Sequence, residues 1–484
     1  MPQQPIQIRS FVPEAPQGKS RIKWWGPGIL WAISSVGSGS ILFTPRIGSE
    51  YGYSFLWLLL MVCFLMWIMI REAGRFSVVT GRTVLDGFST LPGPRNWALW
   101  LIFVPQLFAA AVGVAGLSGL AGSALKTVLP GGLILWSITL LWASVFLVGF
   151  GGYKWVSRVA QIFALIMVVV TFLAALQSKP DLQSFTVGLA PNIPDNLDIP
   201  FVLPWVGTIL AGSMGILWYS YWVATKGYGG AVGELHKGED VDDVEEEGRS
   251  EKDYYAAIDG LKAWMRTMSN TALIGVLIGT LTITSFLVLG VELLKPEGIV
   301  PSGVDVALQL TKLLSEIWGS LGYWVMMMAI VVILGGSVIA NQDGWARSFA
   351  DITLLLPLSG YEKGGDEQVK KKAPPKWMHP MVFWRPSKMG YRQALKIFYL
   401  VSITGIASTA LILAIGDPVK IMSFSGIIAA VHTPFIVFTT FALNLNLPEG
   451  VRPRLVTNGL MVAAGLFYTV FMVLYAINFF SGGM

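Results

Sequence analysis

The stretch Gly26-Pro-Gly-Ile-Leu-Trp-Ala-Ile-Ser-Ser-Val-Gly-Ser-Gly-Ser-Ile-Leu-Phe-Thr-Pro45 decides the fold. It is apolar enough to enter a bilayer, but its middle, Gly37-Ser38-Gly39-Ser40, forms a helix poorly. Each glycine costs a helix about 1 kcal/mol relative to alanine, and broken backbone in hydrocarbon is tolerated only beside protein or a water-filled cavity. We therefore predict a discontinuous span whose unwound centre is a binding site. The alternative is that these small residues only let a neighbouring helix approach closely.

The composition is that of a polytopic membrane protein. Of the 484 residues, 54% are hydrophobic and 13% are charged, whereas soluble domains carry roughly 25% charged residues. The single Cys63 lies in an apolar run, which excludes a disulfide framework and a cysteine metal site. Residues 1–23 are expected to form a disordered cytoplasmic tail, because they begin with a polar segment that lacks the apolar core of a signal peptide.

Eleven stretches approach the roughly 20 apolar residues that cross a bilayer. They are 26–48, 53–71, 97–122, 132–151, 155–177, 201–224, 269–292, 320–342, 394–415, 421–445 and 456–480. With the N-terminus in the cytoplasm, 28 of the 34 Lys and Arg residues fall on the inside. This asymmetry follows the positive-inside rule and predicts a protein of the plasma (inner) membrane with a cytoplasmic N-terminus and an external C-terminus.

The sixth span repeats the irregularity of the first. Gly212, Ser213 and Gly215 interrupt Ile209-Leu-Ala-Gly-Ser-Met-Gly-Ile-Leu-Trp218 near mid-depth. Interrupted spans five apart and of opposite orientation are typical of an inverted 5+5 repeat. The predicted parts are a first repeat at 24–177, an external loop at 178–200, a second repeat at 201–445, and an eleventh helix with the C-terminus at 446–484.

Two polar segments interrupt the second repeat. Residues 229–266 carry the acidic run Glu239-Asp-Val-Asp-Asp-Val-Glu-Glu-Glu247, and residues 359–392 carry Lys370-Lys-Lys372 with two tryptophans. We interpret the first as a solvated cytoplasmic loop that ends in a short surface helix. We interpret the second as a segment attracted to the anionic surface of the membrane, so that lipid is an expected partner.

Motifs in four places resemble those of one known family. The first span opens with Gly26-Pro27, and the other three are Gly74-Arg-Phe-Ser-Val-Val-Thr-Gly-Arg82, Ala211-Gly-Ser-Met214 and Ser425-Gly-Ile-Ile-Ala-Ala-Val-His-Thr-Pro-Phe435. In order and spacing they resemble the natural resistance-associated macrophage protein (Nramp) family, whose motifs read GPxxLxxxxxxDPGN, GxVTGR/K, AxxM and SQxxxxxQxPF. Glu50-Tyr-Gly-Tyr-Ser-Phe-Leu-Trp57 also follows at the family's spacing.

The resemblance implies a fold and a cargo. The fold is an all-helical LeuT-like 5+5 inverted repeat with discontinuous helices one and six, and the cargo is a divalent transition metal, generally coupled to protons. The family's metal ligands are the Asp and Asn of DPGN, the Met sulfur and Ala carbonyl of span six, and a Gln of span ten. In this sequence the Asp and Asn positions are Gly37 and Ser40, and the Gln position is Gly426. The Met and Ala of span six are kept as Met214 and Ala211, and a second Gln of the family's span ten falls at His432.

Several of these positions depart from the family pattern. The family's Asp is Gly37 here, its Asn is Ser40, and no Asp or Glu occurs between Asp86 and Asp181, where the family carries part of its proton route. The predicted site therefore offers no carboxylate, and hard divalent cations need several oxygen ligands. We therefore expect no metal site. If the protein does bind a metal, Met214 is the expected ligand.

We predict that the central site binds a small organic solute. The expected binding residues are Gly37, Ser38, Gly39, Ser40, Ala211, Ser213, Met214, Gly215, Tyr219, Gly426 and His432. Helix N-termini after each break would face the centre and favour an anionic group. Trp218, Tyr219, Tyr221 and Trp222 could pack an organic substrate or an amine, or could serve ordinary helix packing. His432 could be a satisfied core histidine, a substrate contact or a proton carrier.

Charged pairs at helical spacing mark two candidate gates. Arg46 and Glu50 lie beyond the first break and could form an outer gate. Asp343, Arg347 and Asp351 lie near the cytoplasmic end of span eight, where an ion pair on the helix face or an inner gate is expected.

The sequence thus predicts a secondary active transporter that works by alternating access, and not an enzyme. The solute is small and organic, and whether it carries a carboxylate stays open. A divalent metal cation transporter is the first alternative, and a non-transporting membrane sensor is the second. No cofactor and no nucleic acid are expected, and the coupling ion, proton or sodium, is not identified.

Overall fold

The computed structural model describes residues 12–34, 36–152, 154–229, 251–356, 378–382, 384–386 and 389–481. Throughout this part of the chain the regular structure is helical, as the sequence predicts. Residues 1–11 of the predicted tail, residues 230–250 of the acidic loop and the Lys370-Lys-Lys372 segment lie outside the described residues. The end of the predicted disordered tail is ordered, because Gly18–Trp24 form the short 3-10 helix η1.

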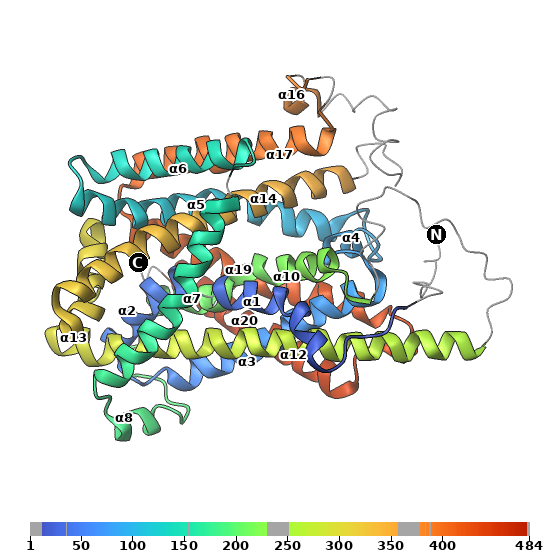
Figure 1. The fold of residues 1–484 in the computed structure, drawn as a ribbon, viewed down its shortest axis with the longest axis horizontal. Coiled ribbons are helices and arrows are strands. Elements are labelled where there is room, and N and C mark those ends of the chain that lie inside the picture. Colours follow the sequence, from blue (N-terminus) through green and yellow to red (C-terminus); the bar gives the residue numbers. More distant parts are fainter. Residues whose placement is uncertain are drawn as a thin grey trace.

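The predicted spans are found as apolar helices. Ten helical segments of the described chain are long and apolar enough to cross a membrane, and the shorter α6 (Leu133–Gly149) is an eleventh apolar helix. The unbroken ones besides α6 are α3 (Leu56–Thr80), α5 (Trp97–Val128), α7 (Lys154–Gln177), α12 (Glu251–Leu289), α19 (Pro418–Leu445) and α20 (Leu455–Phe480). These helices run side by side along the long axis of the molecule, with α7 crossing them obliquely (Figure 1).

The other spans are composite. The first comprises α1 (Gly26–Ser34), η2 (Gly39–Phe43) and α2 (Thr44–Tyr51), and the sixth comprises α9 (Ile199–Thr208), η3 (Ile209–Ala211) and α10 (Gly212–Lys226). The eighth joins α13 (Val306–Ala329) through η8 (Ile330–Leu334) to α14 (Gly335–Leu355), and the ninth joins α17 (Tyr391–Val401) through η11 (Ser402–Ala407) to α18 (Ser408–Ile415). Short helices α4 (Val84–Phe88), α8 (Leu182–Val187) and α16 (His379–Val382) lie in connecting segments.

Two helices differ from the expected boundaries. The predicted surface helix before span seven is continuous with that span, because α12 runs unbroken from Glu251 to Leu289. Its N-terminal end projects beyond the other helices in Figure 1. Within α13, Trp318 and Gly319 leave helical geometry, with Gly319 at φ 57°. The eighth span therefore bends at Gly319, and its outer part forms a separate segment.

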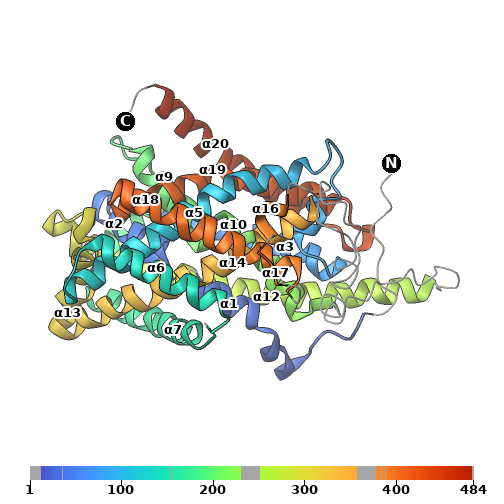
Figure 2. The same cartoon turned by 90° about the horizontal axis from the view of Figure 1, so that it is seen from above.

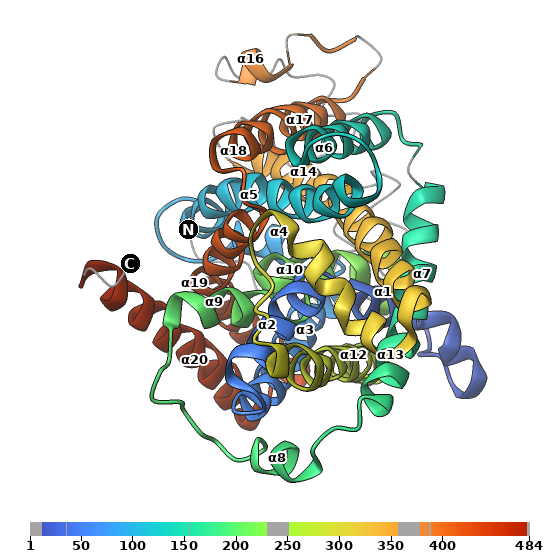
Figure 3. The ribbon, with the colours of Figure 1, turned by 90° about the vertical axis from the view of Figure 1, so that its left-hand side faces the viewer.

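The two broken spans lie together at the centre and run in opposite directions. Viewed along the bundle, α1, α2 and α10 are surrounded by α5, α14, α7, α12 and α3 (Figure 3). The start of α1 meets the end of α10, since a Cβ on Gly26 would lie 4.0 Å from Lys226 Cε. On the other side of the breaks, the rings of Tyr51 and Phe201 lie 6.0 Å apart, edge to face. This antiparallel pairing is what an inverted repeat requires.

Glycines bring the first span against α12 on both sides of its break. A Cβ on Gly28 would lie 2.1 Å from the carbonyl oxygen of Thr271, and one on Gly48 would lie 2.6 Å from that of Leu287. Real Cβ atoms do not approach this closely, so both positions need glycine. Close approach of this kind is the usual means of helix packing in lipid, where no hydrophobic effect drives association.

A buried carboxylate ties α3 to the last helices. Glu72 is fully buried and forms ion pairs with Arg71 (3.1 Å) and Arg75 (2.7 Å). Asn444 Nδ2 donates to the Glu72 carbonyl oxygen (2.9 Å), and Arg71 donates to Thr457 of α20 (3.0 Å). The cluster therefore joins α3, α19 and α20; α20 lies at the edge of the bundle and angles away from it (Figure 2).

We expect Glu72→Gln to destabilise the protein, because the substitution leaves two partly buried arginines without their counter-charge. Breaking a buried pair costs roughly 3 kcal/mol, so the melting temperature in detergent should fall by several degrees. Glu297→Gln is the control, since Glu297 pairs with Lys312 at the surface, where such pairs contribute little. Equal melting temperatures for the two variants would contradict this role of Glu72.

Candidate functional site

The break in the first span lies between α1 and η2. After α1 ends at Ser34, Val36 and Gly37 have bend geometry, and the helix resumes as Ile41 N–H donates to the Gly37 carbonyl (2.9 Å). Here the backbone meets the sixth span, because a Cβ on Gly39 would lie 2.4 Å from the carbonyl oxygen of Thr208. The sequence analysis gives an interrupted helix and a close approach of a neighbouring helix as alternatives. The structure shows both at this position.

The break in the sixth span stores backbone strain. Leu210 adopts φ 60° and ψ 30°, and Gly212 adopts φ 66°. A non-glycine residue in the left-handed region costs on the order of 1–2 kcal/mol, and Leu210 is fully buried. Just before the break, a Cβ on Gly207 would lie 2.0 Å from the carbonyl oxygen of Gly426 in α19. Spans one, six and ten are thus locked together by backbone contacts around the two breaks.

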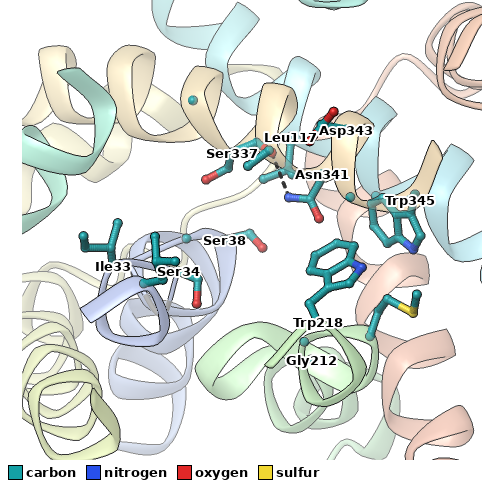
Figure 4. A pocket seen from close by; sticks show the side chains of 18 of the residues that line it. Ile33, Ser34, Ser38, Leu117, Gly212, Trp218, Ser337, Asn341, Asp343 and Trp345 are labelled. Atoms are coloured by element: carbon teal, nitrogen blue, oxygen red, sulfur yellow. Dashed lines mark hydrogen bonds between the residues drawn. The ribbon is translucent and has the colours of Figure 1, made fainter. Parts of the chain in front are cut away.

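A cavity of about 630 Å³ lies beside the two breaks. Spans one, three, five, six, eight and ten line it, and Figure 4 shows Ser34 and Ser38 facing Asn341 and Trp218 across it. The cavity follows α1 and α10 as far as Thr225 and Lys226, which are exposed. No residue of α2 lines it, and Ile47 and Tyr51 on α2 are buried. The cavity therefore reaches one end of the bundle, the end at which α1 begins.

The structure places some of the predicted binding residues at this cavity and others behind it. Those that line it are Gly37, Ser38, Gly39, Ser213, Met214 and Gly215. Those that do not line it are Ser40, Tyr219, Gly426 and His432, all of which are buried. Ala211 lies in the break itself, and its side chain is outside the described part of the structure.

His432 belongs to a polar network in the wall of the cavity. Gln106 Nε2 donates to His432 Nδ1 (2.7 Å) and to Ser213 Oγ (3.1 Å), while Trp345 Nε1 donates to Gln106 Oε1 (3.2 Å). The second ring nitrogen, Nε2, lies 3.1 Å from the Leu101 carbonyl. Because that carbonyl can only accept, Nε2 carries the proton, Nδ1 accepts, and the imidazole is neutral. Within this network His432 has the geometry of a satisfied core histidine.

The charged residues at the mouth of the cavity are paired. Asp343 lies 2.6 Å from Arg347, as its spacing predicts, and 2.6 Å from Lys396 of α17. Asp351 does not continue that pair but binds Arg392 (2.6 Å) and accepts from the Tyr221 hydroxyl (3.0 Å). These pairs join α14 to α17 beside α10, which is where the sequence places an inner gate.

The predicted outer gate has a different geometry. The Arg46 guanidinium lies over the ring of Phe201, 4.9 Å from its centroid, and Glu50 is exposed. Arg46 Nη1 has no hydrogen-bond partner among the described residues. Arg46 of α2 therefore contacts α9 in this structure.

The residues that the structure describes show no preformed metal centre. In the described part of the chain, no three His, Cys, Asp or Glu side chains gather closely enough to hold a metal ion. The groups that the sequence analysis missed are mostly neutral: Gln106, Ser337, Asn341 and Trp345 all line the cavity. Gln106, an amide within the apolar α5, was the available signal, because such polar groups are costly in lipid and usually face the bundle interior.

Comparison with known proteins identifies the family. A family model described as "Natural resistance-associated macrophage protein-like" matches residues 28–339. The chain belongs to this family. Its fold and family are those of membrane transporters rather than enzymes.

Two relatives show how far the sequence similarity extends. The divalent metal cation transporter MntH of Listeria monocytogenes is 28% identical over 173 residues, which cover 34% of this chain and 37% of that protein. MntH of Aeromonas hydrophila is 23% identical over 194 residues, 37% of this chain and 45% of that protein. The chain thus matches less than half the length of each relative.

The fold extends over nearly the whole chain. A manganese transporter of Eremococcus coleocola, solved with an aromatic bis-isothiourea compound, superposes with a TM-score of 0.62 at 13% identity, covering 99% of this chain and 92% of that one. Mhp1, a nucleobase-cation-symport-1 family transporter, superposes with a TM-score of 0.51 at 12% identity, covering 98% and 94%. These likenesses confirm the predicted LeuT-like architecture.

We expect Gly39→Ala to disrupt the junction of the two breaks, because its Cβ would overlap the Thr208 carbonyl. The variant should lose thermal stability, with a melting temperature several degrees below wild type in detergent. Gly459→Ala in α20 is the control, since nothing lies within 4 Å of a Cβ there and alanine favours the helix. An unchanged melting temperature for Gly39→Ala would show that the breaks do not pack as described.

Proposed function

We propose that this protein is a secondary active transporter that moves a small organic solute through the central cavity by alternating access. The observation that carries this proposal is the charge of the cavity. Among the described residues that line it, Asp343 is the one carboxylate, and it is already paired with Arg347 and Lys396. A bare cation entering the cavity would have to compete with two fixed cations for its only anionic ligand.

The size and the chemistry of the cavity also favour an organic solute. A water molecule occupies about 30 Å³ in the liquid, so a cavity of about 630 Å³ has room for a molecule of amino-acid or nucleobase size. Mg²⁺ and Mn²⁺ prefer sites crowded with oxygen ligands. The neutral hydroxyls and amides here are spread over several spans and suit a larger ligand.

The breaks supply a place for an anionic group. The first backbone N–H groups of a helix lack partners within that helix, and Ser213, Met214 and Gly215 begin α10 at the cavity wall. The positive end of the helix dipole adds to this preference. Arg347 and Lys226 also line the cavity. A carboxylate on the solute would therefore be favoured, although none is required.

The proposed transport cycle follows from which side of the breaks is open. The cavity follows α1 and α10 to exposed residues, whereas α2 packs against α9 and α12. With the predicted orientation, in which the N-terminus is cytoplasmic and the C-terminus is external, this is a state open to the cytoplasm. Closing α1 and α10 while separating α2 from α9 would expose the same site to the outside of the plasma membrane. The proposed partners are the solute, membrane lipid and a coupling ion, proton or sodium.

Divalent metal transport is the second candidate. The MntH relatives and the Eremococcus coleocola structure are named as divalent metal or manganese transporters, and the Met214 residue lines the cavity, where its sulfur could contact a soft ion. A sensor that binds but does not transport is a third.

Binding and flux measurements distinguish these functions. We expect saturable calorimetric binding and proteoliposome uptake for at least one solute in a panel of amino acids, organic acids and neutral amides. We expect no saturable binding of Mn²⁺. Binding of Mn²⁺ that Met214→Ala abolishes would establish the metal alternative instead, and solute binding without flux would establish the sensor.

Gly37→Asp tests whether the cavity lacks only a carboxylate. Gly37 lines the cavity, and a Cβ there would meet only the Ser34 carbonyl, at 3.6 Å. We expect this variant to gain weak Mn²⁺ binding, measured by calorimetry, while the uncharged control Gly37→Asn gains none. Equal behaviour of the two variants would mean that charge at this position does not decide which cargo binds.

A further inference from the structure

We propose that Asn341 and Trp218 form a subsite for a planar, uncharged group that carries a hydrogen-bond donor beside an acceptor, such as an aromatic carboxamide or a heterocyclic lactam. This inference rests on the proposed function and names the class of solute that the same cavity takes. The subsite lies on the side of the cavity formed by α14 and α10, opposite Ser34 and Ser38 (Figure 4).

Asn341 has an amide that is oriented and only partly used. Its Nδ2 donates to the Ser337 carbonyl one turn earlier, at 2.8 Å. Because a carbonyl can only accept, this bond fixes which end of the amide is nitrogen. It is the one hydrogen bond that Asn341 makes among the described residues, so Oδ1 and the second N–H remain for a ligand. A planar amide with one acceptor and one donor matches a group that presents the complementary pair, as in asparagine contacts to adenine.

Trp218 presents an apolar face because its polar atom is already bonded. The indole Nε1 donates to Ser348 Oγ at 3.2 Å. The ring of Trp345 lies edge to face with it, 5.5 Å away at 70°, and Trp345 Nε1 is bonded to Gln106. In Figure 4 Asn341 lies across from the Trp218 ring and points toward it. A ligand bonded to Asn341 would therefore lie against an aromatic surface, where stacking favours planar groups.

The backbone of α14 holds the Trp218 ring in this position. A Cβ on Gly344 would lie 2.8 Å from Trp218 Cζ2 and 3.0 Å from Cε2. The ring thus packs directly on the helix backbone, three residues from Asn341. Both groups of the subsite are positioned by the same turn of α14, which fixes the spacing between the amide and the aromatic face.

Net charge plays little part in this subsite. The nearest ionic side chains on α14, Asp343 and Arg347, are paired with each other, and the groups that face the proposed ligand are an amide, an indole and the Ser337 hydroxyl. A neutral group would bind here without losing hydration of a charge, whereas an ammonium or a divalent ion would find no free anionic partner.

The test uses benzamide, uracil and adenine as probes with the full-length protein, and cyclohexanecarboxamide as the probe that keeps the amide but loses the planar ring. By calorimetry, we expect saturable binding of at least one planar probe, at least fivefold tighter than cyclohexanecarboxamide. Asn341→Leu and Trp218→Leu should each weaken that binding by roughly tenfold, whereas Trp218→Phe should retain most of it, because stacking on an aromatic ring contributes strongly.

Two controls keep the result interpretable. Trp324→Leu removes a tryptophan that is 54% exposed on α13 and outside the cavity, and it should leave binding unchanged. Melting temperatures of all variants report whether each is folded. Gly344→Ala offers an independent route, since it displaces the Trp218 ring without removing any binding group and should weaken the planar probe selectively.

The failure of this inference is distinguishable from failure of the proposed function. If no planar probe binds, or if Asn341→Leu folds and binds them as tightly as wild type, the subsite is wrong. Saturable uptake of another organic solute would then leave the transporter proposal intact. If the wild-type protein binds only Mn²⁺, both proposals are overturned.

Discussion

The arrangement of this protein depends on close backbone contact between two broken spans. Gly39 lies against the Thr208 carbonyl, and Gly207 lies against the Gly426 carbonyl, with no room for a Cβ at either position. These contacts hold three spans together at the depth where two of them leave helical geometry. In lipid, unwound backbone is tolerated only when it is covered by protein or faces a cavity. The same contacts therefore make the breaks possible and position their N–H groups at the cavity.

The character of the cavity follows from what surrounds these breaks. Gln106 links Ser213, His432 and Trp345 in a network whose donors and acceptors are matched, so the wall is polar without being charged. At the mouth, Asp343 is held by two cations. The MntH relatives are named as divalent metal cation transporters, whereas the described residues around this cavity offer mainly neutral hydrogen-bonding groups and aromatic faces. We propose that the transported substrate changed together with these residues.

Much of the architecture could be predicted from the sequence because hydrocarbon imposes strict rules. The number of spans, the breaks near Gly37 and Gly212, and the Asp343–Arg347 pair all follow from hydropathy, helix propensity and spacing. Helix ends were less predictable: α12 extends to Glu251 because a polar amphipathic segment continues the helix beyond the membrane. The helical segment before the bend at Gly319 was not predicted, although the predicted start of the eighth span at residue 320 falls directly after that bend.

The site was harder to predict, because lining a cavity depends on which face of each helix meets its neighbours. Ser40, Tyr219, Gly426 and His432 fall at plausible positions in sequence, yet packing turns them away from the cavity. Gln106 and Asn341 were overlooked because no motif contains them, although an isolated amide in an apolar span, as Gln106 is, is itself a signal. Their roles become visible only when their hydrogen-bond partners are known.

The most direct test of the central claim, that the junction of the broken spans is not a divalent-cation site, is an anomalous difference map from crystals grown with Mn²⁺. We predict no anomalous peak between Ser38 and Met214, while the two spans remain broken in the experimental density. A strong peak within roughly 2.0–2.6 Å of oxygen atoms at this junction would contradict the account and favour a divalent metal as the ligand of the site.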